Sequence, residues 1–512
     1  MEKNNLPVSF ISFDIEALPG RASQDLVDRC IWGKFDGNEF GISRICYILK
    51  QHHIKANFLI DFSACLLYGD REITKIIQYL LEHGHEIHAH LHSEWVLRKW
   101  GFKSKLDDPI GMDRLNHRFT KSLLQYVTFK YSQLVGHNPV LFRSGAFLFN
   151  PYTVEAAACA GFKALSNFNN ERHAQAWIVS AEAANNEPFR WNDKLIELPV
   201  DFSPEPLSSE WEKYTGWFDR VKYRKTRKTF NLVLHSWSLL SRGDDGHFTG
   251  YKPDHEQRLH MICEHLRSHT EVMGYNDFLV SEPVFPLLST QTFRPSKLEI
   301  DSPLEIDSVN EECIICGTIF SSKLSDDVCS GCGSRARHRQ LYDVLKKRGN
   351  PFVGKKVLAC HAISLEKQIF LSDASMLVNF DIRPVANLRM DIQNMDKVED
   401  CSFEVFFALH VLNHVKDDRK ALKEIHRVLK PGGFALVTIP YREKSSTTAC
   451  ENLTEHYGEE ALINYGVGSF RRYGLQDILS LFGEFFSVQV ETGIDLITKE
   501  SMKIFILEKI WA

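Results

Sequence analysis

Short apolar runs alternate with helix-like segments through the first half of the chain. Runs typical of strands lie at Val8–Phe13, Lys55–Ile60, Glu86–His92, Leu141–Arg143, Leu195–Val200 and Leu232–His235. The segment Glu72–Glu82 instead repeats apolar residues at helical spacing, at Ile73, Ile76, Ile77, Leu80 and Leu81. Strands that alternate with helices predict a parallel α/β sheet or barrel, whose chemistry lies at the carboxyl ends of the strands.

A second alternating region begins near residue 346. Its strand-like runs are Lys356–Cys360, Leu377–Asp381, Phe403–His410 and Phe434–Pro440. The segment Asp418–Leu429 has one apolar face, begins at two Asp residues and ends before Lys-Pro-Gly-Gly, so it predicts a helix. This pattern predicts a Rossmann-like, doubly wound unit, in which ligands bind at the carboxyl ends of the strands.

The region between the two patterns has a different composition. Residues 283–312 combine Ser, Thr, Pro and acidic residues without periodicity, which is typical of a linker, and a cysteine-rich segment follows. We therefore predict four parts: a barrel at residues 1–282, a linker at 283–308, a cysteine-rich ribbon at 309–345 and a Rossmann-like domain at 346–512. A chain of 512 residues agrees with this division, because one domain typically takes about 100–200 residues.

Composition excludes several classes of protein. Hydrophobic residues make up 44% and charged residues 25%, which excludes a disordered or fibrous chain. A net charge of −5 provides no global basic field, so nucleic-acid binding is not expected. No run approaches the roughly 20 apolar residues that span a bilayer, and residues 1–10 lack the apolar segment of a signal peptide. Twelve cysteines that include two Cys-x-x-Cys pairs indicate metal binding in a reducing compartment, so we expect a cytoplasmic protein.

Acidic and histidine residues gather at two of the predicted strand ends. Asp14 and Glu16 are two positions apart, so both carboxylates can enter one site from one face of a strand. His88, His90 and His92 alternate in the same way along another strand. Two histidines and one carboxylate are a recurrent ligand set for a divalent metal, which leaves positions open for water and substrate. This pattern predicts a metal site that activates water.

Five short motifs in this region together resemble the polysaccharide deacetylase (NodB-homology) family, a distorted (β/α) barrel. They are, in chain order, SFDIE at Ser12–Glu16, GHEIHAH at Gly84–His90, FRSGAF at Phe142–Phe147, LIELPVDFS at Leu195–Ser203 and LVLHSW at Leu232–Trp237. The resemblance implies that Asp14 is the general base and Glu16 a metal ligand, although these two roles are interchangeable. It also implies that His90 is the first histidine ligand.

The later motifs imply three further catalytic residues. Arg143 would orient Asp14, Asp201 would belong to the weaker fourth motif of the site, and His235 would protonate the departing amine. The sequence departs from the family where a second histidine is usual, four residues after the first, because Glu94 stands there. Either Glu94 ligates the metal as a carboxylate, or His92 supplies the second nitrogen. Ser144 replaces the usual proline after Arg143, so the substrate subsite is expected to differ.

Four cysteines follow the linker at a spacing that is typical of metal binding. They are arranged as Cys313-x2-Cys316-x12-Cys329-x2-Cys332, and a glycine follows each pair. Four thiolates favour a tetrahedral, structural zinc without an open position, with iron as the alternative. The arginine-rich exit at Ser334–Gln340 would either contact phosphate or form a solvated helix start. The lack of interleaved aromatic residues disfavours a nucleic-acid interface there.

The segment Phe407–Pro440 resembles the middle of class I S-adenosylmethionine-dependent methyltransferases. The Cys-x-x-Cys-Gly-Ser-x-x-Arg-His-Arg motif at Cys329–Arg339 resembles one subfamily with an N-terminal zinc knuckle. The resemblance implies S-adenosylmethionine as the cofactor, with Asp381 on the ribose hydroxyls and Asp391–Ile392 beside the adenine. The residues that we expect to line this cofactor site are Cys360, His361, Asp381, Asp391, Ile392 and His410.

The first loop of this domain departs from the family. Cys360–Lys367, with the sequence CHAISLEK, lacks the glycine-rich turn that lets the cofactor approach the backbone. The domain therefore either binds the cofactor through an atypical loop or is a degenerate domain kept for packing. His361, His410 and His414 are the candidate bases for methylation of oxygen.

These features together predict a bifunctional enzyme that tailors a sugar. One domain would remove an N-acyl group with a divalent metal, and the other would methylate a hydroxyl or the freed amine. Without a secretion signal, a nucleotide-linked, lipid-linked or short saccharide is a better substrate than an external polymer. The first alternative is a single-activity deacetylase with a methyltransferase-like scaffold. The second is an interaction or RNA-binding protein that uses the zinc ribbon.

Overall fold

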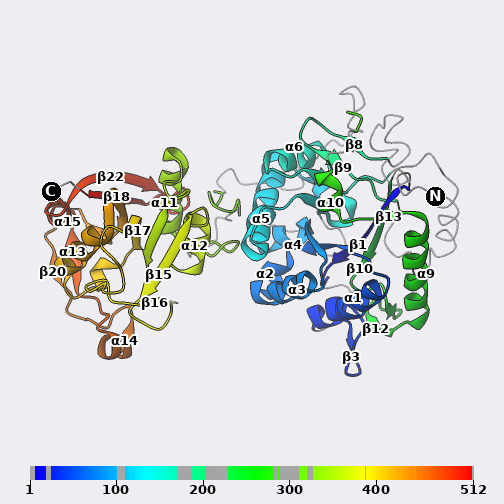
Figure 1. Ribbon diagram of the computed structural model, residues 1–512, viewed down its shortest axis with the longest axis horizontal. Helices are drawn as coiled ribbons and strands as arrows, with labels where there is room; N and C mark the ends of the chain where they lie inside the picture. The colour runs from blue at the N-terminus through cyan, green and yellow to red at the C-terminus, as the bar shows by residue number, and fades with distance from the viewer. Residues whose placement is uncertain are drawn as a thin grey trace. The chain divides into compact units, whose positions relative to one another are not determined.

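The computed structural model divides into two compact units (Figure 1). Unit 1 comprises residues 1–310 with 316–322, and unit 2 comprises residues 311–315 with 323–512. The structure describes residues 6–18, 25–100, 110–169, 187–201, 207, 229–281, 285–287, 311–319, 327–386, 388–443 and 445–509. Most of the predicted linker lies outside these residues, so the predicted domain boundaries stay a prediction.

Unit 1 is built around a nine-stranded, mostly parallel sheet that curls like a half-barrel. Its strands are, in spatial order, β10 (Thr229–His235), β1 (Val8–Ile15), β4 (Asn57–Asp61), β5 (Glu86–Leu91), β6 (Leu141–Ser144), β7 (Ala164–Leu165), β9 (Ile196–Glu197) and β8 (Phe189–Arg190), while β13 (Glu271–Val272) also pairs with β1. The register sets Asp14 opposite His235 and His90 opposite Arg143. Four of the predicted site residues therefore meet at the carboxyl edge of neighbouring strands.

Helices pack around this sheet and bury their apolar faces against it. They are α1 (Ile42–Gln51), α2 (Ala64–Tyr68), α3 (Asp70–Glu82), α4 (Ser93–Lys99), α5 (His117–Val135), α6 (Pro151–Cys159), α9 (Pro253–His269) and α10 (Tyr275–Val280). In α3 the predicted apolar face is buried except for Leu81, which is 45% exposed. The core side chains of α3 include Ile73, Ile76, Ile77 and Leu80, as their spacing predicts.

Unit 2 contains a seven-stranded mixed sheet. Its strands are, in spatial order, β16 (Leu388–Arg389), β15 (Met376–Asp381), β14 (Lys356–Cys360), β17 (Phe403–Leu409), β18 (Leu429–Thr438), β23 (Ser501–Lys509) and β22 (Phe486–Ile494). The first five strands are parallel, and β23 and β22 add an antiparallel edge. The order reverses between β15 and β17, on either side of β14, which creates the crevice where doubly wound sheets bind ligands.

Both faces of the unit 2 sheet are buried, which explains why its central strands are apolar throughout. In β17, Phe406 and Ala408 face one core cluster, whereas Val405 and Phe407 face another. The first face is covered by α13 (Asp418–Val428) and α15 (Leu475–Gly483), and the second by α11 (Ala336–Arg348) and α12 (Ser364–Phe370). The helix predicted at Asp418–Leu429 is thus present as α13. The predicted α/β class, with a parallel barrel-like sheet and a Rossmann-like domain, is confirmed.

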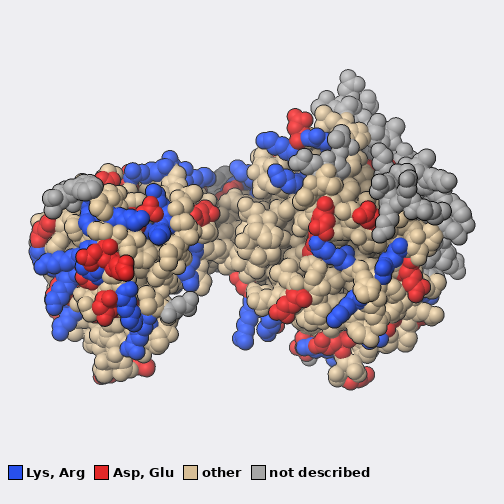
Figure 2. All heavy atoms as spheres, viewed as in Figure 1, with Lys and Arg blue, Asp and Glu red and all other residues tan. Residues whose placement is uncertain are grey.

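Two global properties bear on function. None of the helices in the described ranges has the length and apolar composition needed to cross a membrane. On the face drawn in Figure 2, basic and acidic side chains are interspersed over each unit, as the small net charge suggests.

Candidate functional site

A buried cluster of two histidines and a carboxylate lies at the carboxyl edge of β1 and β5. Glu16 follows β1, and its Oε1 lies 2.7 Å from His90 Nε2 and 3.0 Å from His92 Nε2. All three side chains are buried. His92, and not Glu94, joins Glu16 and His90 in this cluster. Two nitrogen donors and one carboxylate are a donor set that is typical of divalent-metal sites with open positions.

The outer nitrogen of each ring is also held. His90 Nδ1 lies 2.9 Å from the Arg143 carbonyl oxygen, so Nδ1 carries the proton and Nε2 faces Glu16. His92 Nδ1 lies 2.7 Å from Glu94 Oε1. Carbonyl and carboxylate partners on the far nitrogen are the usual means of orienting metal-bound histidines. The cluster therefore fits a divalent metal, with Glu94 as support for His92.

The three groups are coupled electrostatically. Burial alone would raise the pKa of Glu16, but the charge of His92 and the hydrogen bonds of both rings hold this pKa well below its ordinary value. Burial would lower the pKa of His92, but Glu16 and Glu94 raise it well above its usual value. The pKa shifts thus favour an ionised Glu16 carboxylate that is paired with protonated His90 and His92 rings.

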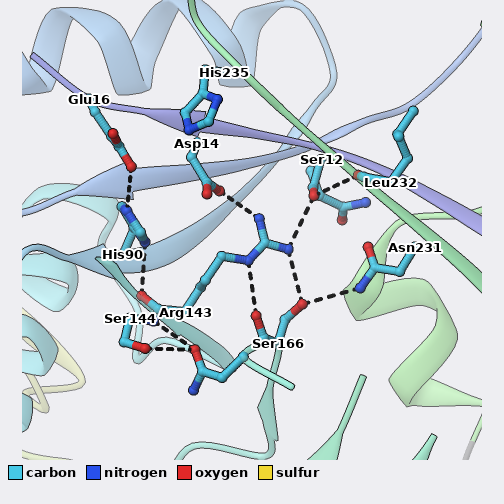
Figure 3. A network of polar contacts seen from close by, with 12 residues as sticks. Ser12, Asp14, Glu16, His90, Arg143, Ser144, Ser166, Asn231, Leu232 and His235 are labelled. Atoms are coloured by element: carbon cyan, nitrogen blue, oxygen red, sulfur yellow. Dashed lines mark hydrogen bonds and ion pairs between the residues drawn. The ribbon is translucent and has the colours of Figure 1, made fainter. Parts of the chain in front are cut away.

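Asp14 lies beside this cluster in an ion pair with Arg143 (Figure 3). Arg143 Nη1 contacts Asp14 Oδ1 at 2.5 Å, and both side chains are buried. Its Nε and Nη2 atoms contact acceptors from three separate segments, at Ser12, Ser166 and Tyr275. These contacts are Nε to Ser166 O at 3.1 Å, and Nη2 to Ser12 Oγ at 3.2 Å, Ser166 Oγ at 3.0 Å and Tyr275 OH at 3.1 Å. Arg143 is therefore fixed in a position that orients the Asp14 carboxylate.

The two other predicted catalytic residues lie in different places. A ring nitrogen of His235 and carboxylate oxygens of Asp14 and Glu16 lie within 4.8 Å of one another, and Figure 3 shows His235 next to Asp14. The His235 ring stacks on Trp237 at a centroid distance of 4.6 Å. Asp201 Oδ2 instead accepts the Asn231 N–H at 2.6 Å, and Asn231 Oδ1 accepts the Tyr275 hydroxyl at 2.6 Å. Asp201 thus belongs to the network that supports Arg143.

Asp61 is a buried acid at this edge that the motifs do not identify. It ends β4, and its Oδ1 accepts the backbone N–H groups of Ser63 at 2.9 Å and His92 at 3.2 Å. Burial raises the pKa of Asp61, which His92 and His90 partly oppose. Its signal in the sequence is an acidic residue that directly follows an apolar strand, as in the case of Asp14.

Gly145 is expected to be essential for the position of His92. A Cβ at residue 145 would lie 2.6 Å from His92 Nδ1 and 2.8 Å from its Cε1. Gly145→Ala should therefore push the ring away from Glu16 and lower metal affinity by about tenfold to a hundredfold. Metal titration of the full chain measures this loss. Gly250→Ala, whose nearest atom is 3.8 Å away, is the matched control and should bind metal normally; equal affinities in the two variants would contradict the prediction.

Glu197 is a fully buried carboxylate that hydrogen-bonds to the segment after β7. Its Oε1 accepts the N–H groups of Asn167 at 2.7 Å and Phe168 at 2.8 Å, and its Oε2 accepts the Trp191 indole N–H at 2.7 Å. The Asn167 side chain in turn accepts the Ser144 N–H. Burial raises the pKa of Glu197 to about 7, against the opposing effect of these hydrogen bonds. Sequence reasoning missed this residue, because its only signal is a carboxylate inside an apolar motif.

This raised pKa predicts a pH-dependent stability. The folded state holds the Glu197 proton more tightly than the unfolded chain, so stability falls as pH rises from about 4.5 to about 7. The glutamine in Glu197→Gln cannot titrate. Between pH 4.5 and pH 7, the free energy of unfolding of the wild type should therefore fall by about 3 kcal/mol relative to that of the variant. Denaturant unfolding of both proteins at several pH values tests the difference. Glu271 is exposed, so Glu271→Gln serves as the control. A difference in free energy of unfolding between wild type and Glu197→Gln that stays constant with pH would refute the raised pKa.

The four cysteines form a second candidate metal centre. Their sulfurs lie within 4.8 Å of one another, all four side chains are buried, and none forms a disulfide. Cys313 Sγ and Cys332 Sγ are 3.8 Å apart, which matches the edge of a tetrahedron with zinc–sulfur bonds of about 2.3 Å. Gly317 and Gly333 have φ of +75° and +74°, so each pair ends in a left-handed turn that favours glycine. The residues fit a structural zinc.

Five of the six predicted cofactor residues of unit 2 line one cavity. Its walls include Cys360, His361, Asp381, Asp391 and Ile392, together with Gln393, His414 and Tyr457. His410 directly follows β17, next to the wall residue Val411, and has a positive φ of 55°. The cavity thus occupies the crevice at the carboxyl edge of the sheet, where a doubly wound fold binds its ligand.

The Asp381 carboxylate already forms hydrogen bonds and ion pairs with two other residues of the cavity wall. Arg383 Nη2 contacts Asp381 Oδ2 at 2.8 Å, Arg383 Nε contacts Oδ1 at 3.1 Å, and His361 Nδ1 contacts Oδ2 at 2.6 Å. Burial would raise the pKa of Asp381, but these two partners lower it. Asp391 likewise accepts the N–H of Gln393 at 2.9 Å. Ribose hydroxyls would therefore have to share or replace the Arg383 and His361 contacts on Asp381.

Comparison with known proteins identifies part of the chain. Residues 356–437 match the family model of a methyltransferase domain. The chain carries a methyltransferase domain. This finding covers β14 to β18, which includes the strands whose ends line the cavity. S-adenosylmethionine is thereby implied as the cofactor of this domain.

Solved structures resemble parts of the chain at low identity. A protein from Mycobacterium smegmatis that is assigned as a polysaccharide deacetylase is 14% identical, covers 58% of this chain and 97% of its own, and has a TM-score of 0.40. An S-adenosylmethionine-dependent methyltransferase from Mesorhizobium loti is 13% identical, covers 33% of this chain and 97% of its own, and has a TM-score of 0.24. The search of curated proteins finds no match.

Proposed function

We propose that the chain is a bifunctional sugar-tailoring enzyme. Unit 1 would hydrolyse the N-acyl group of an amino sugar, and the methyltransferase domain would then methylate a hydroxyl or the freed amine of the same compound. The observation that carries the first activity is the Glu16–His90–His92 cluster, which lies beside the Asp14–Arg143 ion pair. The substrate class is an N-acylated sugar in nucleotide-linked, lipid-linked or short-saccharide form.

The residues of unit 1 divide the proton transfers of amide hydrolysis between them. A divalent metal held by Glu16, His90 and His92 would supply Lewis acidity to the acyl carbonyl. Asp14, oriented by Arg143, takes the proton of the attacking water as the new carbon–oxygen bond forms. His235 donates a proton to the sugar nitrogen as the carbon–nitrogen bond breaks. The products are the free amine and the carboxylic acid.

The test of this activity is release of acetate by the metal-loaded full chain. UDP-N-acetylglucosamine and N,N′-diacetylchitobiose are suitable probes of a nucleotide-linked and a short saccharide. Acetate release that requires added Zn²⁺ or Co²⁺ and is abolished in His90→Ala would support the proposal. A metal-loaded protein that binds one metal per cluster and releases no acyl group from either probe, or from a lipid-linked analogue, would refute it.

A second candidate is a deacetylase whose methyltransferase domain is only a scaffold. The observation in its favour is that both oxygens of Asp381 are already bonded to Arg383 and His361. Calorimetric titration of the full chain with S-adenosylhomocysteine separates the two. Binding in the micromolar range that is lost in Asp381→Ala would favour the bifunctional enzyme, and an absence of binding would favour the scaffold.

The third possibility, RNA binding by the zinc ribbon, has less support. Arg339 is fully buried and makes a bidentate ion pair with Asp495, with contacts of 2.9 and 2.8 Å. Arg335 pairs with Asp327 at 3.4 Å. Two of the three arginines at the exit of the ribbon are therefore engaged within the protein. We infer that this segment joins the ribbon to the methyltransferase domain.

A further inference from the structure

The first three backbone N–H groups of the loop after β14 are not free to bind an anion. In glycine-rich loops such groups hold the negatively charged part of a ligand. Here the N–H groups of the first three loop residues already have acceptors, which are Phe380 O at 2.8 Å from His361 N, Asn379 Oδ1 at 2.9 Å from Ala362 N and Glu366 Oε2 at 3.1 Å from Ile363 N. These three groups therefore cannot hold a negative group of a ligand at this edge of the sheet.

The first turn of α11 lies against this same loop. His338 Nε2 contacts Glu366 Oε1 at 3.1 Å, and both side chains are buried. Because His338 Nδ1 accepts the Arg335 N–H, the Nε2 atom carries the proton and donates it to Glu366. This contact holds the turn that carries Arg337 beside the carboxyl edge of the sheet.

Arg337 is a cation without a counter-ion. Among the described residues its guanidinium forms no ion pair, and its buried Nε has no hydrogen-bond partner. Arg383, the cation in the cavity wall, by contrast forms an ion pair with Asp381. An unpaired, partly buried guanidinium costs free energy that an anionic ligand group would recover.

The charge of Arg337 acts on the cavity at its β17 end. Burial raises the pKa of the wall residue Tyr457, and the charges of Arg383 and Arg337 oppose this rise. Burial lowers the pKa of His410 to about 3, and the nearby Arg337 adds to this effect. Neutral His410 and Asn413 each keep one buried side-chain atom, Nε2 and Oδ1, that lacks a hydrogen-bond partner within the described residues. His410 and Asn413 are the chain neighbours of the wall residues Val411 and His414, so the region next to the cavity at the end of β17 combines one cation with polar atoms that lack partners among the described residues.

We propose that Arg337 binds the α-carboxylate of the methionine part of S-adenosylmethionine, in place of a glycine-rich turn. The inference rests on the proposed cofactor role of this cavity. With the adenine at Asp391–Ile392 and the ribose at Asp381, the amino-acid part would point toward the ends of β14 and β17, near the first turn of α11 that carries Arg337. A guanidinium and a carboxylate form a planar, bidentate pair, which suits a site whose first loop N–H groups are already engaged.

Two ligands that differ only in the amino-acid part test this assignment. S-adenosylhomocysteine carries the carboxylate, whereas methylthioadenosine lacks it and keeps the adenosine. Calorimetry on the full chain should show that Arg337→Met weakens S-adenosylhomocysteine binding about tenfold to a hundredfold and leaves methylthioadenosine binding unchanged. Arg337→Lys should recover part of the affinity. Arg335→Met, which removes the exposed neighbour paired with Asp327, is the matched control and should bind both ligands normally.

Each other outcome overturns the assignment in a recognisable way. If Arg337→Met binds S-adenosylhomocysteine as the wild type does, Arg337 does not contact the cofactor, and an anionic methyl acceptor becomes the partner to test. If it loses affinity equally for both ligands, its role is to support the fold of the cavity, which thermal melting would show as a lowered midpoint. If the wild type binds neither ligand, the proposed cofactor site itself fails, and the Arg337 assignment fails with it.

Discussion

Replacing Asp14 by asparagine is expected to slow deacylation by about a hundredfold to ten-thousandfold while the metal stays bound. Asparagine has the same shape and still accepts the hydrogen bond from Arg143 Nη1, which contacts Asp14 Oδ1 at 2.5 Å. It lacks the basic oxygen that would take a proton from water. Because the metal cluster consists of Glu16, His90 and His92, its ligands remain in place. Acetate release and metal content, measured on the same samples, test both parts of the prediction.

The matched variant is Glu16→Gln, which should lose the metal and the activity together. An Asp14→Asn protein that keeps half of the wild-type turnover would rule out Asp14 as the base. One that loses its metal would instead make Asp14 a ligand. That exchange of roles is compatible with the second group of close donor atoms, Asp14, Glu16 and His235.

Cys329→Ser is expected to remove one zinc per chain and to unfold the ribbon. Structural zinc sites of this type contribute binding free energy of about 10–16 kcal/mol to folding. The four cysteines pack close to the start of α11, where the Ser334 hydroxyl lies 3.2 Å from Cys332 Sγ. Loss of the metal should therefore expose residues 311–335 to proteolysis and lower the thermal midpoint of the methyltransferase domain. Zinc content, limited proteolysis and thermal melting measure the three effects.

Cys401→Ser is the control for this change, because Cys401 is exposed and lies outside the cluster. It should keep its zinc and its protease resistance. A Cys329→Ser protein with an unchanged zinc content would show that the four thiolates do not form the site. Iron in place of zinc would be detected by the same metal analysis and by the colour of an iron–thiolate centre.

Much of the unit 1 site follows from local sequence patterns. Asp14 near the end of β1 and Glu16 just after it lie on one side, as do His90 near the end of β5 and His92 just after it, because side chains alternate along an extended chain. The partners of Arg143 do not follow from such patterns. Tyr275, which contacts Arg143, is 132 residues away in the chain and comes from a helix outside every motif. The positions of His92 and Glu94 also depend on the turn after β5, because Glu94 lies in the first turn of α4 and its carboxylate contacts His92 Nδ1.

In the methyltransferase domain, too, some features are visible in the sequence and others depend on tertiary packing. The absence of glycine at Cys360–Lys367 is visible in the sequence, and it predicts an atypical cofactor loop. That Asn379 and Glu366 occupy the loop N–H groups is not visible, because it depends on how β15 and α12 pack against the loop. Nor does the sequence show that Arg383, two residues after Asp381, folds back onto that carboxylate.

The sequence by itself determined the α/β class, the order of the strands and helices, the spacing of the four cysteines and most of the chemistry at the strand ends. These depend on periodicity and spacing within short segments, which the backbone geometry of helices and strands imposes directly. Only the tertiary structure showed which acidic and histidine side chains come close together, that Glu197 is buried with a raised pKa, and that Arg337 is left without an acidic partner among the described residues. Burial, desolvation and pairing are set by residues far apart in the chain, so local patterns do not determine them.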